Sequence, residues 1–193
     1  MLGLRLPTDP RWVNIVEKNI QEILTDHAYC EQKAASNAIT VIVKFPEFPE
    51  VVTAMSELAK EELDHFQMVH NEMLKRNLTL GFERKDEYVN DLYQFQLKGG
   101  SKEQQFVEKM LFGAMIEARS CERFKILSEE INDPDLRVFY RDLMESEARH
   151  YTLFINFARK YAPSVDVNKR WQEYLAFEAE LMKKYGKKET MHG

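Results

Sequence analysis

Apolar residues recur along most of the chain in alternating steps of four and three positions. This period places them on one face of an α-helix, whereas a strand would alternate every second residue. Proline, glycine and Asn/Asp clusters interrupt the pattern at intervals and mark the ends of the helices. The pattern predicts an all-α fold with helices at about 11–44 (with a break allowed near Asp26), 49–76, 84–98, 102–131, 135–161 and 167–185.

Two of these helices begin with recognisable capping signals. Asp133 precedes Pro134, which is a capping residue followed by proline in the first turn. Ser101 is followed by Glu103 and Gln104, so its hydroxyl can cap the helix at 102–131. Both signals support the predicted helix starts.

Four of the predicted helices carry charged residues in rows that should be apolar. Two of them contain a Glu-x-x-His pair in that row, and the helix before each pair contains a single glutamate. The inward-facing residues are Glu31, Glu62, His65, Glu117, Glu147 and His150. Four helices are therefore predicted to point four carboxylates and two imidazoles into one core.

The spacing of these residues repeats along the chain. Glu31 and Glu62 are 31 positions apart, and Glu117 and Glu147 are 30 apart. The second Glu-x-x-His pair follows the first by 85 positions. The chain therefore reads as two copies of a helix pair, an arrangement typical of a symmetric two-metal site in a four-helix bundle.

Four buried carboxylates are stable only if something neutralises them, because an unpaired buried charge costs several kcal/mol. Two divalent cations supply four positive charges, and neutral imidazoles add ligands without adding charge. Residues three apart on a helix share a face, so each Glu-x-x-His pair can bind one ion. Glu31 and Glu117 can bind terminally or bridge the ions. Carboxylate and imidazole ligands together favour iron or manganese over structural zinc.

Other interpretations of these residues stay open. All six could be ordinary, partly exposed helix residues. Glu61 competes with Glu62 as a ligand, although Ser146 stands at the equivalent position of the second half. Glu122 and Glu145 lie off the apolar rows and are expected in solvent.

Several neighbours of the candidate ligands also have two interpretations. His27, one turn before the first glutamate, can orient that glutamate or be a structural histidine. Asp64 and Arg149 each precede a candidate ligand histidine, where they can support it or form surface ion pairs. Cys30 and Cys121 are expected to be small core residues.

Composition narrows the class of protein. The 193 residues are 44% hydrophobic with 7 Gly, 6 Pro and 2 Cys, which suits one domain spanning 1–193. Two cysteines exclude a disulfide scaffold and a Cys₄ zinc or rubredoxin-type site. With neither a signal peptide nor a run of about 18 apolar residues, we expect a soluble cytoplasmic protein without a membrane contact. The tail at about 187–193 is expected to be disordered, and its Glu-x-x-His match at Glu189 to His192 accidental.

Three segments resemble one known family. They are Asp26-His27-Ala28-Tyr29-Cys30-Glu31-Gln32-Lys33-Ala34-Ala35, Glu61-Glu62-Leu63-Asp64-His65-Phe66 and Glu145-Ser146-Glu147-Ala148-Arg149-His150-Tyr151. In wording, order and spacing they are similar to the tRNA hydroxylase family called MiaE, of the ferritin-like di-iron superfamily. The resemblance covers about residues 5–186. It implies a ferritin-like four-helix bundle with additional flanking helices.

The resemblance also implies a reaction and a ligand set. The reaction is O₂-dependent hydroxylation of the isopentenyl group on a hypermodified adenosine next to the tRNA anticodon, by a centre of two iron ions. All six inward-facing residues match the iron ligands of the family: Glu31, Glu62, His65, Glu117, Glu147 and His150. Because the sequence contains neither Gly-x-Gly-x-x-Gly nor Cys-x-x-Cys, the electrons are expected from a separate reductase or ferredoxin partner. Either a monomer or a dimer is compatible with the sequence.

A formal net charge of −5 gives no global electrostatic reason to expect a nucleic-acid partner. A tRNA substrate would therefore need a local basic patch. Candidates are Lys33, Lys44, Lys98, Lys102, Arg119, Arg123, Lys125, Lys183, Lys184, Lys187 and Lys188. Small residues near the inward glutamates, among them Ala35 and Gly113, can leave room for a prenyl group or allow close helix packing.

Two competing functions complete the sequence-based hypotheses. One is a different di-iron activity, namely a ferroxidase, a peroxidase or an oxygenase of another substrate. The other is a helical interaction module without metal, which leaves four inward glutamates unexplained.

Overall fold

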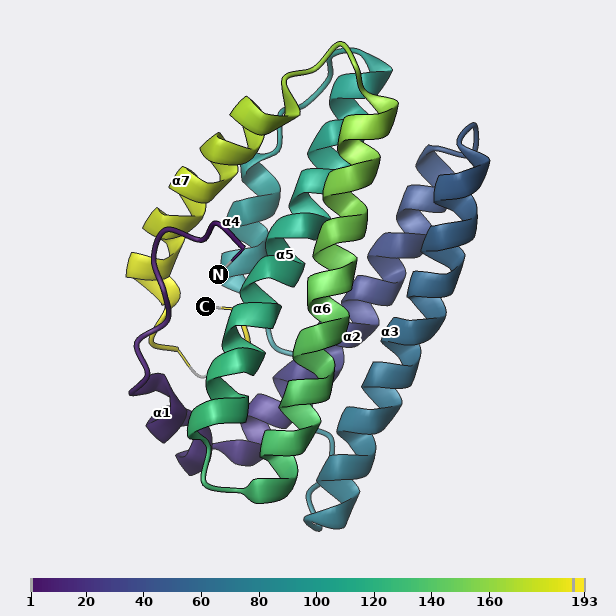
Figure 1. Cartoon of the computed structure of the whole chain (residues 1–193). Helices are drawn as coiled ribbons and strands as arrows, with labels where there is room; N and C mark the ends of the chain where they lie inside the picture. The colour runs from purple at the N-terminus through teal and green to yellow at the C-terminus, as the bar shows by residue number, and fades with distance from the viewer. Residues whose placement is uncertain (1, 189, 193) are drawn as a thin grey trace. The chain divides into compact units, whose positions relative to one another are not determined.

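The computed structural model describes residues 2–188 and 190–192, which form α-helices joined by loops and contain no strand (Figure 1). The helices are α1 (Trp12–Lys18), α2 (Ile20–Lys44), α3 (Pro49–Lys75), α4 (Glu87–Phe95), α5 (Lys102–Glu130), α6 (Pro134–Tyr161) and α7 (Val167–Tyr185). The predicted all-α fold is confirmed, and every predicted helix has a counterpart at its position.

The first predicted helix is interrupted at Asn19, and the break allowed near Asp26 is wrong. Asn19 has a non-helical backbone with φ −134° and ψ 40°, and an asparagine side chain competes for backbone hydrogen bonds. Asp26 instead lies buried within α2, where its carboxylate accepts a hydrogen bond from the Met191 N–H at 2.7 Å. The buried carboxylate therefore has a partner distant in sequence, and the helix continues through Asp26.

Both predicted capping signals are confirmed. The Ser101 hydroxyl accepts the Gln104 N–H at 3.2 Å, and the Gln104 side chain accepts the Ser101 N–H at 2.8 Å. The Asp133 carboxylate accepts the N–H groups of Asp135 and Leu136 at the start of α6. These reciprocal bonds fix where α5 and α6 begin, and thus the register of the residues they carry.

The chain divides into two compact units. The α2–α3 unit comprises residues 18–85 and 190–191, and the α5–α6 unit comprises residues 2–17, 86–188 and 192. Each unit contains one long helix pair and half of the candidate ligands.

In the α2–α3 unit, the two long helices pack against each other as an antiparallel pair. After α3, residues 76–85 return along α2 as an irregular segment, which we call the return strap. Gln21 Nε2 donates to the Thr79 carbonyl at 3.2 Å, and the Gly81 N–H donates to Thr25 Oγ1 at 3.2 Å. Side chains of α2 thus satisfy backbone groups of the strap.

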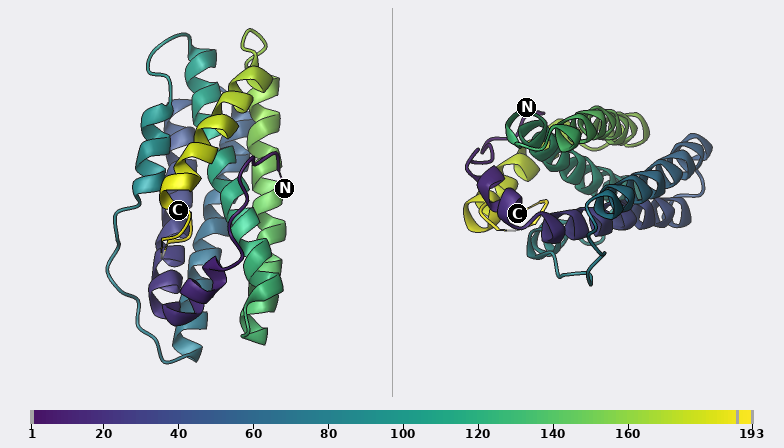
Figure 2. Two further views of the ribbon diagram at one scale, coloured as in Figure 1. Left: turned by 90° about the vertical axis from the view of Figure 1, so that its left-hand side faces the viewer. Right: turned by 90° about the horizontal axis from the view of Figure 1, so that it is seen from below.

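In the α5–α6 unit, α5 and α6 form the second antiparallel pair and run side by side in both views of Figure 2. Helices α4 and α7 pack against α5. A Cβ added at Gly113 would lie 2.9 Å from the ring of Phe154, so the glycine lets α6 approach the backbone of α5. At this position the structure favours close helix packing over space for a prenyl group.

A buried ionic network holds α5 against α7 and the N-terminal segment. Arg119 is fully buried and donates to Glu178 Oε1 at 2.8 Å and 2.5 Å, and to Glu122 at 2.7 Å. The Glu122 carboxylate also accepts the Thr8 N–H and hydroxyl. Glu122, which the sequence places in solvent, is only 6% exposed. The sequence does not indicate its partners because they lie far away along the chain. Arg119 and Arg123 are both 0% exposed, which removes them from the candidate tRNA surface.

The described part of the tail is packed, which differs from the expected disorder. Met191 and His192 are 0% and 2% exposed. Within the α5–α6 unit, His192 Nδ1 lies 3.1 Å from Asp86 Oδ2 and its Nε2 lies 3.1 Å from Ser120 Oγ. The tail therefore has specific partners, whereas Glu189 lies outside the described residues. Among the described residues, none of the helices is long and apolar enough to span a membrane.

Candidate metal centre

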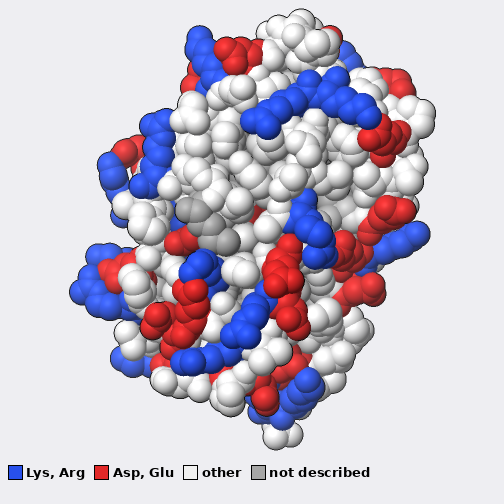
Figure 3. Space-filling model, in the orientation of Figure 1, with Lys and Arg blue, Asp and Glu red and all other residues white. Residues whose placement is uncertain are grey.

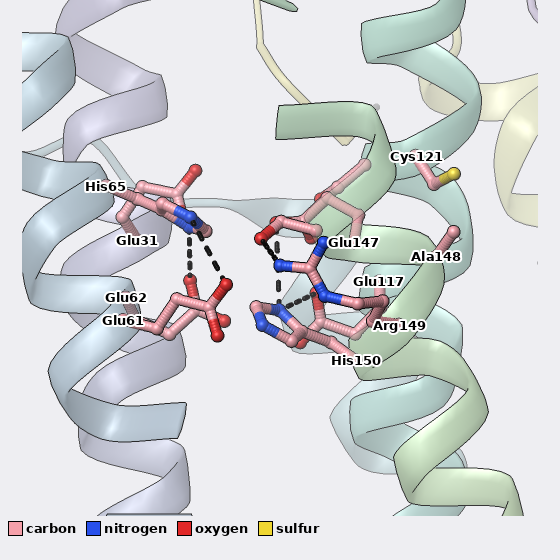
Figure 4. Close-up of polar contacts among 12 residues, drawn as sticks. Glu31, Glu61, Glu62, His65, Glu117, Cys121, Glu147, Ala148, Arg149 and His150 are labelled. Carbon is pink, nitrogen blue, oxygen red and sulfur yellow. Dashed lines mark hydrogen bonds and ion pairs between the residues drawn. The ribbon is translucent and has the colours of Figure 1, made fainter. Parts of the chain in front are cut away.

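The α2–α3 unit brings together Glu31 from α2 with Glu62 and His65 from α3 (Figure 4). His65 Nδ1 lies 3.2 Å from Glu62 Oε2 and 3.8 Å from Glu31 Oε2. The three residues, which we call the α2–α3 triad, are 0–6% exposed. Three side chains that the sequence predicts to face inward thus meet in a buried position.

The α5–α6 unit contains a matching set, the α5–α6 triad, formed by Glu117 of α5 with Glu147 and His150 of α6 (Figure 4). His150 Nδ1 lies 4.0 Å from Glu117 Oε2 and 3.9 Å from Glu147 Oε1. All three are 2–4% exposed. The repeat seen in the sequence is therefore also a repeat of local geometry.

Each triad fits one metal ion by its dimensions. A protein N or O ligand lies about 2.0–2.2 Å from such an ion, so two ligands of the same ion are at most about 4.4 Å apart. Both triads place the histidine nitrogen 3.2–4.0 Å from two carboxylate oxygens. The donor set of two carboxylates and one imidazole suits iron or manganese.

The charged groups of the α2–α3 triad shift one another's pKa values. Burial lowers the pKa of His65, but hydrogen bonds and charges from Glu31 and Glu62 outweigh it and raise that pKa to about 10. Burial raises the pKa of Glu31, yet hydrogen bonds from His27 and His65 prevail and hold that pKa below its usual range. The pair of carboxylates therefore favours a positive charge at this position, which a proton on His65 or a metal ion can supply.

His27 holds the Glu31 carboxylate from the side of α2. Its Nε2 lies 2.6 Å from Glu31 Oε1, and the imidazole is fully buried one turn before the glutamate. Of the two interpretations of His27, the contact favours the one in which it orients Glu31.

The rival ligand Glu61 is less well placed than Glu62. Its Oε1 lies 3.9 Å from His65 Nε2, and its side chain is 39% exposed, against 0% for Glu62. Asp64 and Glu145 are both exposed, which favours the surface interpretation of Asp64 and agrees with the solvent position expected for Glu145. Arg149 donates to Ser146 Oγ at 2.8 Å.

The thiol of Cys121 is a structural group. It donates to the Met144 carbonyl at 3.3 Å, and burial together with Glu117 and Glu122 raises its pKa to about 12. Cys121 therefore stays protonated and fills space between α5 and α6, as expected from the sequence.

Sequence reasoning missed the groups that hold α5 in place. Glu108 of α5 binds Arg170 of α7 at 2.6 Å and accepts the Tyr174 hydroxyl at 2.8 Å. Together with the Arg119 network, this contact anchors the helix that carries Glu117 on both sides of it. The sequence shows Arg119 and Glu122 three positions apart, but nothing in it indicates the partners on α7.

A family model for tRNA-(MS2IO6A)-hydroxylase (MiaE) matches residues 2–193. The chain belongs to the MiaE family. It is 35% identical over 179 residues to the tRNA 2-(methylsulfanyl)-N(6)-isopentenyladenosine(37) hydroxylase of Pseudomonas putida, covering 93% of this chain and 86% of that protein. To the enzyme of the same name from Salmonella typhimurium it is 28% identical, covering 93% of this chain and 83% of that one. The family resemblance read from the sequence is confirmed.

A solved structure supports the fold assignment. The chain is similar to "Protein 43 with aldehyde deformylating oxygenase activity" from Synechococcus, with a TM-score of 0.90 and 33% identity. The similarity covers 98% of this chain and 95% of that one. The predicted ferritin-like helical fold is confirmed by this likeness.

Proposed function

We propose that this chain is an O₂-dependent tRNA hydroxylase that acts on the isopentenyl group of the modified adenosine at position 37. Its membership of the MiaE family supports the substrate, and both curated relatives carry that activity in their names. The observation that carries the chemistry is the pair of matching buried triads, each with two carboxylates and one imidazole. We place the protein in the cytoplasm, where its tRNA substrate is found.

We infer that the two triads together hold two iron ions. Six donors would then bind the two ions: Glu31, Glu62 and His65 in one unit, and Glu117, Glu147 and His150 in the other. Their four carboxylates balance the charge of two divalent cations, which removes the cost of burying them. When bound, the iron ions supply the activation of O₂, which side chains alone cannot perform.

The residues of the chain prepare this site in three ways. Burial of all six donors below 7% exposure keeps bulk water away from the reaction. His27 fixes the orientation of Glu31 through a 2.6 Å contact. The capping box and the ionic networks of α5 fix the position of Glu117 along its helix.

The two electrons that hydroxylation requires come from outside the chain in this proposal. The reaction inserts one oxygen atom of O₂ into a C–H bond and reduces the other to water, which consumes two electrons and two protons. The sequence has no Gly-x-Gly-x-x-Gly and no Cys-x-x-Cys that would indicate a nicotinamide or dithiol site. We therefore propose a separate reductase or ferredoxin as the partner.

Mass spectrometry of tRNA nucleosides tests the substrate. Cells with the gene should contain the hydroxylated form of 2-methylthio-N6-isopentenyladenosine, and cells without it should accumulate the form lacking one oxygen atom. Complementation with Glu117→Ala should fail, whereas Glu145→Ala, an exposed glutamate of α6, should restore the product. Equal nucleoside profiles with and without the gene would refute the tRNA assignment.

Iron analysis tests the centre separately. The purified protein should bind about two iron ions per chain, and Glu117→Ala should bind less. A protein that binds no metal yet hydroxylates tRNA would contradict the proposed ligand set.

A second candidate is oxygenation of a different substrate. The likeness to the Synechococcus protein, whose name includes aldehyde deformylating oxygenase activity, favours this candidate specifically. Iron-loaded protein supplied with a reductant and a long-chain aldehyde should yield no shortened hydrocarbon if the tRNA proposal is correct.

A further inference from the structure

Phe82 stands fully in solvent on the return strap. Its side chain is 96% exposed, the highest value among the large apolar side chains of the described residues. An aromatic ring gains nothing for stability in this position, since it buries no surface in the free chain. The backbone that carries it is nevertheless held firmly.

Two hydrogen bonds anchor the strap at Gly81, directly before Phe82, and one exposed ion pair follows it. The Gly81 N–H donates to Thr25 Oγ1 at 3.2 Å, and the Gly81 carbonyl accepts the Tyr29 hydroxyl at 3.0 Å. On the other side, Lys33 Nζ lies 2.9 Å from Glu83 Oε1. Phe82 therefore directly follows a backbone position that is hydrogen-bonded to α2.

The anchors also place Phe82 along α2. Tyr29 and Lys33 lie two positions before and two positions after Glu31, so the strap passes α2 at the level of that residue. At about 100° per residue, both anchors point about 200° away from Glu31. Phe82 thus stands on the outer surface of α2, roughly one helix diameter of about 10 Å from the inward glutamate.

Cationic residues neighbour Phe82 along the strap or pair with the residue that follows it. Lys85 is exposed, and the side chains of Lys33 and Arg84 are 36% and 35% exposed in ion pairs with Glu83 and Glu22. Ion pairs that are this exposed to water are weak, so a phosphate can replace the carboxylate as the partner of the cation. An exposed aromatic ring beside cations is the arrangement that binds unpaired nucleotides, through stacking on a base and contact with the backbone.

We propose that Phe82 stacks on an unpaired base of the tRNA anticodon loop, and that Lys85 contacts its phosphate backbone. This inference rests on the proposed function, which supplies as substrate an RNA loop whose bases are unpaired. Stacking accepts any base, so Phe82 acts as a binding residue for the loop and not as a reader of sequence.

The test is the affinity of the full-length protein for an anticodon stem-loop RNA carrying 2-methylthio-N6-isopentenyladenosine, measured by fluorescence anisotropy. Phe82→Ala should weaken binding about 10-fold, and Phe82→Trp should keep it within about 3-fold of the original. Val43→Ala is the matched control, because Val43 is a 73% exposed apolar residue of the same unit. It should bind as the original does.

Salt dependence separates the two roles. Lys85→Ala should reduce the slope of log affinity against log salt by about 0.7, as expected for one lost phosphate contact. Phe82→Ala should leave that slope unchanged while raising the KM of hydroxylation and leaving kcat at saturating RNA unaltered. The exposed ring contributes no burial, so the thermal unfolding of Phe82→Ala should match that of the original protein.

Equal RNA affinity of Phe82→Ala and the original protein would overturn the inference. So would a change in sedimentation of Phe82→Ala without RNA, because it would assign the ring to contact with a second copy. If the original protein binds RNA through Phe82 but forms no hydroxylated nucleoside, the inference stands and the proposed function fails. If hydroxylation proceeds and Phe82→Ala has no effect, only the inference fails.

Discussion

His27 holds one of the proposed metal ligands, Glu31, in place before any ion is bound. Its Nε2 lies 2.6 Å from Glu31 Oε1 in a fully buried position, and the opposite side of the same carboxylate faces His65 at 3.8 Å. A carboxylate held in this way loses little freedom when it binds an ion. The contact thus links a residue outside the predicted ligand set to the affinity of the site.

Replacement of His27 by alanine should weaken metal binding about 10- to 100-fold, because Glu31 then has to be ordered by the metal itself. Competition with a chromophoric chelator measures this affinity. His70→Gln is the control, since His70 lies on α3 as a half-buried residue stacked on Phe66. Unchanged affinity in His27→Ala would show that Glu31 is ordered without it.

Arg119 balances the charge of two buried carboxylates in the α5–α6 unit. Its guanidinium is fully buried and forms ion pairs with Glu178 and Glu122. Removal of Arg119 would leave these two buried carboxylates without a positive charge beside them. Arg119→Met should lower the free energy of unfolding by about 3–5 kcal/mol. Urea denaturation checks this value. Lys125→Met, which removes an exposed pair with Glu129, should cost less than about 1 kcal/mol.

The stability of Arg119→Met should depend on pH in a predictable direction. Burial raises the pKa of Glu178 above its ordinary value, and Arg119 opposes this rise. Without the guanidinium the pKa of Glu178 rises further, so the folded variant binds a proton that the unfolded chain releases. Arg119→Met should therefore lose stability, relative to the original, as the pH rises above the ordinary glutamate pKa. A constant difference between pH 5 and pH 7 would contradict the assignment.

At the scale of helices, Gly113 sets how closely α6 approaches α5. A Cβ there would lie 2.9 Å from the Phe154 ring. Helix propensity alone favours alanine over glycine by about 1 kcal/mol, whereas forced contacts in a packed core cost about 1–3 kcal/mol.

Gly113→Ala should therefore destabilise the protein despite the better propensity, and Phe154→Leu should relieve the effect when combined with it. Thermal unfolding of the two single variants and the double variant measures the coupling. A higher unfolding temperature for Gly113→Ala would mean that the Phe154 ring moves aside at no cost.

The helices could be predicted from the sequence because their signals are local. The period of apolar residues, the Ser101 capping box and the Asp133-Pro134 start act over a few residues. The sequence allows a break near Asp26, but the helix continues there and its carboxylate binds the N–H of Met191, 165 positions away. Glu122 was misjudged for the same reason, since its partner Thr8 lies 114 positions away.

The grouping of the six candidate ligands into two triads could also be predicted from local signals in the sequence. Each triad combines an i, i+3 pair with one glutamate from the preceding helix, and the repeat at 85 positions singles these residues out from other glutamates. The sequence draws attention to His27 but cannot choose between its two roles, because only the structure gives its distance to Glu31. The role of Phe82 had no signal at all, since exposure in an irregular strap follows from tertiary contacts.

For the whole molecule, the metal site changes what the net charge means. Four of the 32 acidic residues lie in the buried triads, and two divalent ions would bring the formal charge from −5 to −1. On the face drawn in Figure 3, the remaining acidic side chains are interspersed with Lys and Arg. An acidic composition is therefore compatible with an RNA substrate that meets local cations.

Metal binding should also couple the whole protein to pH through His65. In the metal-free chain, Glu31 and Glu62 raise the pKa of His65 to about 10, so its imidazole carries a proton at neutral pH. A metal ion needs the neutral imidazole and must displace that proton. Deprotonation of His65 should therefore make the apparent affinity for the metal rise about 10-fold per pH unit at pH values below about 10. Metal loading should also raise the unfolding temperature.

Calorimetry of Mn²⁺ binding in buffers of different ionisation enthalpy should detect the released proton, and His65→Gln should abolish this release. Equal heats in all buffers would show that His65 is already neutral when the metal arrives.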